Sequence, residues 1–399
     1  MKRIVIAMTL LLLLAGCQQT QMVNERAAAK QRWQSARAVV ICGVGNEYLK
    51  VGELDKAQAN AEEALHLQED MLAGRILLAK VHLEKGRYGE AAAELQKAQA
   101  LAPHSAQIPY LMGIALEKRG QWDDALESYR QAMAMDESNN AYVMATAEVL
   151  VAKGQPKEAF SLLSVRLAKT EGEAGMLSLT GEAALQADEP AKAAEFYQRA
   201  LDLRKDDLTM REGLAKSHYF AGHYNDALVQ LRKLAENVEY KDKVGWVYSM
   251  MGDCLLAIGR TADAKSAYEL ASRLNPGEAQ VWVGLAKTAL AVKDNDRATL
   301  SAKRALAIEP TLAEGSLLLG YAMFRQGQID GAIQVLETGA KQHPEDSLIR
   351  CALGRCYEAK GLNARATDCY AQALKSDPDS ALAKGLLASA DERRNASAE

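Results

Sequence analysis

Small residues recur along most of the chain with a period of 34 residues. Counting each first residue as position 1, the repeats begin at Ala38, Leu72, Ala106, Asn140, Ala174, Leu208, Gly245, Ala279, Ala313 and Ser347. Position 20 is Ala in all ten repeats, and position 8 is Gly or Ala in all ten. Side chains of this size let two helices approach closely, so the pattern predicts two helices in each repeat that cross where positions 8 and 20 touch.

Glycine and proline fall at fixed positions of the same repeat. Position 15 is Gly in eight repeats, whereas Asp188 and Lys293 take its place in the other two. Five of the eight prolines fall at position 32, and two more fall at position 17. Gly ends a helix well because it adopts the left-handed conformation at little cost, and Pro is tolerated in the first turn of a helix. Each repeat is therefore expected to contain a first helix, a turn at position 15 and a second helix that ends near position 32.

This repeat resembles the tetratricopeptide family (TPR), whose members are built from stacked helix-turn-helix units. The resemblance implies an all-α fold, a right-handed α-α superhelix (solenoid) of about ten such units. Six repeats are expected over residues 38–241 and four over residues 245–380, because the register slips once by three residues, which we place at 242–244. The slip is either a kink in the superhelix or a bulged turn without consequence. Residues 381–399 are expected to form a capping helix and tail.

The first residues are typical of an export signal. Two basic residues precede an apolar run of eleven residues, 4–14, which is shorter than the roughly 20 residues that a membrane-spanning helix needs. The run ends in the sequence LAGC at residues 14–17, which resembles the lipobox of bacterial lipoproteins. The resemblance implies that a signal peptide, residues 1–16, is removed and that Cys17 receives the lipid.

The same resemblance implies a place in the cell envelope. Residues 17–37 are polar and are expected to tether the repeats to the membrane through the lipid on Cys17. Gln18 stands where inner-membrane lipoproteins carry Asp, so we expect the outer membrane, with the repeats facing the periplasm. An anchor with more than one acyl chain is sufficient for stable attachment.

Charge and motifs argue against nucleic-acid binding and catalysis. The chain has a formal net charge of −4 and no basic stripe, so no nucleic-acid partner is expected. It contains no HExxH, GxSxG or CxxC motif and no phosphate-binding loop. His218 and His223 are five residues apart, a spacing that does not put them on one face of a helix, and we expect no metal site there. We therefore expect no enzyme activity and no cofactor.

Five cysteines lie within the repeats, and three of them belong to the last repeat. In an oxidising compartment, Cys356 and Cys369 are a candidate disulfide that would join the two helices of that repeat. Five is an odd number, however, and Cys is also a small residue suited to close helix packing. Both interpretations stay open.

The family resemblance also implies a binding groove. In the family, positions 2, 5, 9, 12 and 13 of each first helix face the concave surface. From the sixth repeat onwards these positions gather aromatic and basic residues, and the candidate partner-binding residues are Tyr219, Phe220, Trp246, Tyr321, Phe324 and Arg325, with Asp253, Lys287 and Arg355 beside them. Exposed rings in a groove favour a protein or peptide segment as the partner. The alternative is that some of these rings pack on neighbouring repeats.

These observations predict a protein-binding scaffold that a lipid holds at the cell envelope. A lipobox followed by tetratricopeptide repeats is similar to the plan of lipoproteins that support pilus or secretin assembly, including those of Tad-type pilus systems. The alternative is a glycan- or peptidoglycan-associated binding module, or a regulator of cell-wall enzymes. A glycan site would pair aromatic residues with Asp, Asn and Gln on one groove wall, and the groove positions contain few such pairs.

Overall fold

A computed structural model describes the backbone of residues 2–170, 172–238 and 244–396, and the side chains between residues 25 and 393 within these ranges. The described backbone forms twenty-one helices, α1–α21, and no strand. This confirms the all-α prediction. The chain divides into two compact units, residues 1–188 (the N-terminal unit) and residues 189–399 (the C-terminal unit).

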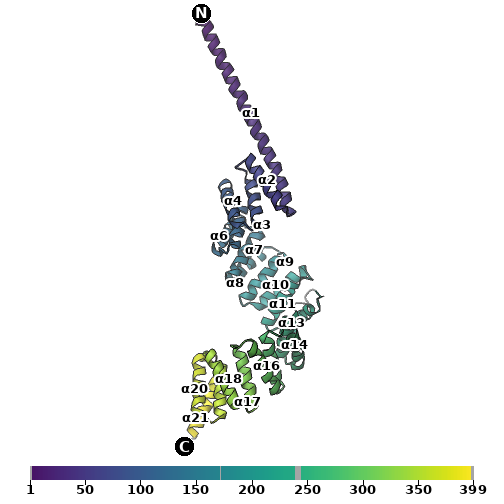
Figure 1. Cartoon of the computed structure of the whole chain (residues 1–399), viewed down its shortest axis with the longest axis vertical. Coiled ribbons are helices and arrows are strands. Elements are labelled where there is room, and N and C mark those ends of the chain that lie inside the picture. The colour runs from purple at the N-terminus through teal and green to yellow at the C-terminus, as the bar shows by residue number, and fades with distance from the viewer. Residues whose placement is uncertain (1, 171, 239–243, 397–399) are drawn as a thin grey trace. The chain divides into compact units, whose positions relative to one another are not determined.

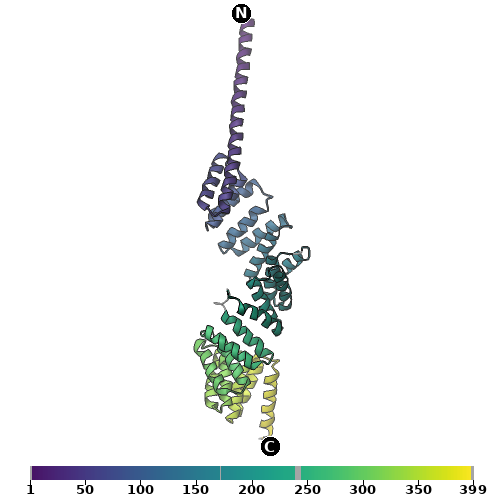
Figure 2. The ribbon, with the colours of Figure 1, turned by 90° about the vertical axis from the view of Figure 1, so that its right-hand side faces the viewer.

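The N-terminal unit consists of four consecutive helix pairs followed by the single helix α9. Its helices are α1 (Lys2–Lys50), α2 (Leu54–Leu67), α3 (Leu72–Glu84), α4 (Tyr88–Leu101), α5 (Gln107–Lys118), α6 (Trp122–Met135), α7 (Asn140–Ala152), α8 (Pro156–Leu167) and α9 (Ala174–Gln186). Figures 1 and 2 show the pairs side by side, with the N-terminal part of α1 extending beyond them. Among the described side chains of α1, burial starts at Ala38, which packs with Cys42 against α2. Within the described residues, no helix is both long and apolar enough to cross a membrane.

The C-terminal unit continues the same arrangement. Its helices are α10 (Pro190–Leu203), α11 (Leu208–Phe220), α12 (Tyr224–Glu236), α13 (Val244–Ala257), α14 (Thr261–Leu274), α15 (Ala279–Ala291), α16 (Asn295–Ile308), α17 (Ala313–Arg325), α18 (Ile329–Gln342), α19 (Ser347–Ala359), α20 (Asn363–Ser376) and α21 (Ala381–Ala396). Helices α11 to α20 form five pairs, stacked in chain order (Figure 1). The last helix, α21, packs Leu386 and Leu387 against the core of the final pair.

The turn between the two helices of each repeat uses the left-handed backbone conformation at position 15. Eight of these positions are Gly, with φ between 72° and 78°. The only described residues other than Gly with positive φ are Asp188, at 64°, and Lys293, at 62°. These are the two residues that replace Gly in the sequence pattern, so the turn keeps its conformation even where the side chain makes it unfavourable.

The small residue at position 8 also makes room for a large side chain at position 24. A Cβ on Gly252 would lie 2.7 Å from the ring of Tyr268, which is at position 24 of the same repeat. Gly113 faces Tyr129 and Gly354 faces Tyr370 in the same way. The predicted contact with position 20 is present in the first repeat, where a Cβ on Gly45 would lie 3.5 Å from the backbone oxygen of Ala57. The ten Ala at position 20 are buried, each with at most 1% of its surface exposed.

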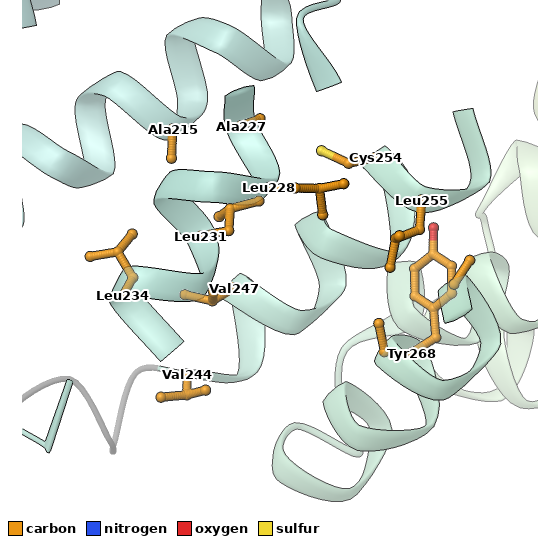
Figure 3. Close-up of a cluster of buried hydrophobic side chains, with 12 residues drawn as sticks. Ala215, Ala227, Leu228, Leu231, Leu234, Val244, Val247, Cys254, Leu255 and Tyr268 are labelled. Carbon is orange, nitrogen blue, oxygen red and sulfur yellow. The ribbon is translucent and has the colours of Figure 1, made fainter. Parts of the chain in front are cut away.

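The core is continuous where the sequence register slips. Leu228, Leu231 and Leu234 of α12 pack in one cluster with Val244 and Val247 of α13, as Figure 3 shows. Residues 239–243 lie outside the described ranges, so of the predicted slip at 242–244 only Val244, the first residue of α13, is described. Apolar packing thus joins the sixth repeat to the seventh across the additional residues.

Candidate functional site

The six predicted groove residues divide by exposure. Phe220 is 62% exposed and Tyr321 is 39% exposed, and Arg325 is also exposed. By contrast, the partly buried side chains Tyr219, Trp246 and Phe324 pack against hydrophobic core clusters. Half of the predicted set therefore also serves the packing between repeats, as the alternative interpretation held for some of the rings.

One group of groove residues surrounds the junction of α11 and α13. The ring of Tyr219 meets that of Phe220 edge-on at 5.2 Å between centroids. Lys216 places its Nζ 5.1 Å from the ring centroid of Trp246 on the next first helix, a cation–π contact. Because Tyr219 is anchored in the core, it supports the exposed ring of Phe220 from one side. Burial also raises the pKa of Tyr219 to about 12, so its hydroxyl stays protonated at neutral pH.

A second group lies on α17 and α19. The guanidinium carbon of Arg325 is 5.9 Å from the ring centroid of Tyr321, and that of Arg355 is 5.9 Å from the ring centroid of Phe324. Arg325 also donates a hydrogen bond of 3.3 Å to the Tyr321 hydroxyl. Tyr321, Phe324 and Arg355 line a small pocket of about 20 Å³ whose floor includes Cys356. This surface combines aromatic faces with two cations.

A larger pocket of about 240 Å³ opens between α13 and α15. It is lined by Trp246, Ser249, Met250, Asp253, Glu278, Gln280, Val283, Gly284 and Lys287. Asp253 accepts a hydrogen bond of 2.6 Å from the hydroxyl of Tyr268. Burial raises the pKa of the Asp253 carboxyl, while the Tyr268 bond and the nearby Lys287 act in the opposite direction. The pocket therefore contains the Asp253 carboxylate, which the Tyr268 hydroxyl holds in place, and the cation of Lys287.

Tyr268 contacts the candidate site through Asp253, and the groove mapping missed it because it lies on a second helix. The sequence did carry a signal for it. Tyr occurs at position 24 in four repeats, as Tyr129, Tyr197, Tyr268 and Tyr370, and all four have Gly at position 8. Tyr129 and Tyr370 donate hydrogen bonds to Glu117 and Glu358, which both occupy position 12 of their repeats. In three of these four repeats the Tyr at position 24 thus donates to a carboxylate at a groove position, which is Glu117, Asp253 or Glu358.

The N-terminal unit carries a different set of groove residues. Burial raises the pKa of Glu148, and the carboxylates of Glu117 and Glu182 raise it further. The rings of Tyr110 and Tyr142 contact each other in the same unit, with 4.9 Å between their centroids. Acidic and tyrosine side chains thus gather in this unit, whereas the C-terminal unit combines rings with Lys and Arg.

The structure brings His218 and His223 together, against the prediction from their spacing. Their ring centroids are 6.0 Å apart. The prediction assumed one continuous helix, but α11 ends at Phe220 and the chain turns at Gly222, whose φ is 75°. Helical spacing does not determine the distance between two residues that lie on either side of a turn. The assumption of one continuous helix was therefore wrong.

The predicted disulfide and lipid sites are placed as follows. Cys356 and Cys369 are free thiols buried in one core cluster, and burial raises the pKa of each to about 11. Their pairing in an oxidising compartment stays a prediction. Cys17 lies in α1, but its side chain is outside the described residues, so lipidation also stays a prediction.

Comparison with known families identifies the repeat. Two family models described as tetratricopeptide repeat match the chain, one over residues 45–106, 110–172 and 249–313 and the other over residues 289–352 and 324–390. Together they reach every repeat except the fifth and the sixth.

Relatives and solved structures share the repeat at low identity. The BBSome complex member BBS4 of Bos taurus is 23% identical over 256 residues, 64% of this chain and 48% of the relative. A DnaJ homolog subfamily C member 7 homolog of Schizosaccharomyces pombe is 25% identical over 185 residues, 42% of this chain and 39% of the relative. The chain thus spans less than half the length of both relatives.

Two solved structures are similar over most of the chain. One is the Cut9-Hcn1 hetero-tetramer of the APC/C, with 14% identity, a TM-score of 0.48 and coverage of 89% of this chain and 96% of that one. The other is yeast Tom70, with 14% identity, a TM-score of 0.44 and coverage of 91% and 97%. We draw no functional conclusion from likeness at this level.

Proposed function

Since the chain belongs to the tetratricopeptide-repeat family, we propose that its C-terminal unit holds an extended protein segment along the first helices α11, α13, α15 and α17. The observation that carries the proposal is Phe220, a ring that is 62% exposed and supported by Tyr219. A partner that covers a Phe side chain gains roughly 1.5–3 kcal/mol from burial alone. Exposed aromatic anchors of this kind dominate the energy of many interfaces.

The polar groups beside the rings define the chemistry of that segment. The pocket carboxylate of Asp253 is already held by Tyr268, so it can accept a further hydrogen bond without reorganisation. Arg325 and Arg355 present cations near the other rings. A segment with apolar anchors, a hydrogen-bond donor for Asp253 and an acidic residue for the arginines fits these groups.

The place of action that we propose is the cell envelope, with the chain anchored through a lipid on Cys17. The support is the apolar run that ends in LAGC at residues 14–17. After removal of residues 1–16, the part of α1 that begins at Cys17 would then join the membrane to the first repeat, because the helix continues to Lys50. In such a position the scaffold is suited to the assembly of an envelope complex, such as a pilus or secretion system.

The test compares crosslinked complexes of the full chain in its native envelope. Phe220→Ala is expected to reduce the yield of the partner adduct about tenfold or more, because it removes the aromatic ring that the partner would cover. The matched control is Leu203→Ala on α10, a side chain that is 59% exposed at a second-helix position outside the groove. Equal yields from both variants, with unchanged helical circular dichroism, would contradict the proposal.

A further inference from the structure

Three potential metal ligands converge at the tip of the sixth repeat. The ligand atoms of His218, His223 and Asp226 all lie within 4.8 Å of one another. His218 is on α11, Asp226 is in the first turn of α12, and His223 lies between the two helices. His223 and Asp226 are exposed, whereas His218 is partly buried. Two imidazoles and a carboxylate thus face one another across a helical hairpin.

The turn itself creates this arrangement. Gly222 adopts the left-handed conformation, and the backbone N–H of His223 donates a hydrogen bond of 2.9 Å to the carbonyl of His218. The bond holds the two histidines together by their backbones, independently of their side chains. Asp226 follows three residues after His223, so its carboxylate lies on the same side of the turn as the His223 ring. The fold therefore places the three residues beside one another before any ion binds.

His218 carries a second observation that points to a ligand. Its Nδ1 is buried and makes no hydrogen bond among the described residues. A buried polar atom without a partner costs about 1–3 kcal/mol, and a ligand bound to this nitrogen would remove that cost.

The second repeat provides an internal comparison. It has His82 at position 11 and Glu90 at position 19, the positions of His218 and Asp226. The buried Nδ1 of His82 lies 3.3 Å from a Glu90 oxygen but, like that of His218, makes no hydrogen bond among the described residues. Position 16, which is His223 in the sixth repeat, is Arg87 there, and its guanidinium lies 3.7 Å from Glu90. The second repeat thus closes the cluster with an ion pair, whereas the sixth replaces the cation by a third potential ligand.

We propose that His218, His223 and Asp226 form a binding site for one Zn²⁺ ion. Histidine nitrogens and a carboxylate oxygen are ordinary zinc ligands, with bonds of about 2.0–2.2 Å, so that the ligand atoms in a tetrahedral site are about 3.4 Å apart. The side chains of His223 and Asp226 are exposed and can rotate the remaining distance. Three protein ligands leave a fourth position for water or for a group of a partner.

The ion would link α11 to α12 at a point next to the groove. His218 immediately precedes Tyr219 and Phe220, the two rings at the end of α11. A metal bond to His218 would restrict the last turn of this helix and thereby the orientation of the exposed Phe220 ring. The site is thus suited to making partner capture dependent on zinc, although zinc binding itself does not depend on the proposed function.

The test is a calorimetric titration of the full chain, purified without a histidine tag, with Zn²⁺ alone. We expect one ion per chain and a rise in the unfolding temperature that saturates at the same ratio. His223→Arg copies the turn of the second repeat and is therefore expected to fold, and it should weaken zinc binding at least about tenfold. Asp226→Asn should weaken it as well.

His104→Ala is the matched control, because His104 is an exposed histidine in a loop of another repeat. It should bind zinc as the wild type does. Absence of zinc binding by the wild type would overturn the proposal. Unchanged affinity in His223→Arg would overturn it too, since the ion would then occupy another place. Zinc binding and the unfolding temperature are both measured without a partner protein. Failure of this proposal can therefore be distinguished from failure of the proposed groove function.

Discussion

The hydroxyl of Tyr268 donates a hydrogen bond of 2.6 Å to Oδ1 of Asp253, and this contact joins the second helix of the seventh repeat to the groove pocket. Tyr268 itself is 1% exposed, so the bond is made from inside the core. Gly252 makes the contact geometrically accessible, because any larger residue there would meet the ring. A residue of the core thus determines the position of a carboxylate on the binding surface.

Replacing Tyr268 by Phe should destabilise the chain by about 1–3 kcal/mol, because the half-buried Asp253 carboxylate loses its donor. The loss should depend on pH. Burial holds the pKa of Asp253 above its unfolded value of 3.8, and the Tyr268 bond opposes that shift. A raised folded pKa means that stability falls as pH rises from the unfolded pKa through the folded one.

The difference between wild type and Tyr268→Phe should therefore be larger at pH 7 than at about pH 2, where Asp253 is protonated in both states. Thermal unfolding at the two pH values measures it. Tyr248→Phe is the control, because Tyr248 has no side-chain hydrogen bond in the described part of the chain. A pH-independent difference would show that the Tyr268–Asp253 bond does not act on the ionised carboxylate.

Gly at position 8 should be as restrictive as its contacts indicate. Gly252→Ala would place a Cβ 2.7 Å from the Tyr268 ring, and overpacking of this kind costs about 1–3 kcal/mol. Gly277→Ala is the matched control in the same unit, since a Cβ there meets nothing within 4 Å. Urea unfolding should separate the two variants by at least about 1 kcal/mol. Equal midpoints would mean that the ring moves aside without cost.

The left-handed turns offer a stabilising substitution. Lys293 has a φ of 62°, a conformation that costs a residue with a Cβ about 1–2 kcal/mol. Lys293→Gly should therefore raise stability by about 0.5–1 kcal/mol, after allowance for the greater freedom of Gly in the unfolded chain. Gly259→Ala, at the same position of another repeat, should lower it by about 1 kcal/mol. Opposite signs in urea unfolding are the expected result, and a loss in both variants would contradict it.

The repeat arrangement was predictable from the sequence because it depends on local residue types. Gly at position 15 and Pro at position 32 mark helix ends, and even the two exceptions, Asp188 and Lys293, take the backbone conformation of the glycines they replace. The contact of position 8 with position 24 was not predictable in this way, since small residues at positions 8 and 20 do not show which other side chain fills the space beside them. The structure places the ring of Tyr268 there.

The groove was harder to predict than the fold. Its positions follow from the repeat, but exposure depends on how neighbouring repeats pack, so Trp246 and Phe324 are half-buried while Phe220 is open to solvent. The proximity of His218 and His223 was not predictable for a related reason, because it depends on the turn at Gly222. Contacts within one helix can be read from spacing, whereas contacts across a turn require the backbone path.

Lipidation of Cys17 can be tested apart from the groove. Cys17→Ser should abolish incorporation of a labelled fatty acid and release the chain from the membrane fraction, because the apolar run of eleven residues is too short to span a bilayer. Gln19→Ser, which changes a neighbouring residue and keeps the LAGC sequence, should leave both unchanged. Continued labelling of Cys17→Ser would contradict the proposed anchor.

The central claim is that a protein segment lies along the C-terminal groove, and site-specific photocrosslinking tests it most directly. A photoreactive phenylalanine analogue would replace Phe220, Tyr321 or Leu203, one at a time, in the full chain within its native envelope. All three are exposed, and Leu203 lies on a second helix. We expect the analogue at positions 220 and 321 to give a discrete partner adduct of one mass, and the analogue at position 203 to give none. Adducts from 203 alone, or the same adduct from all three, would contradict it.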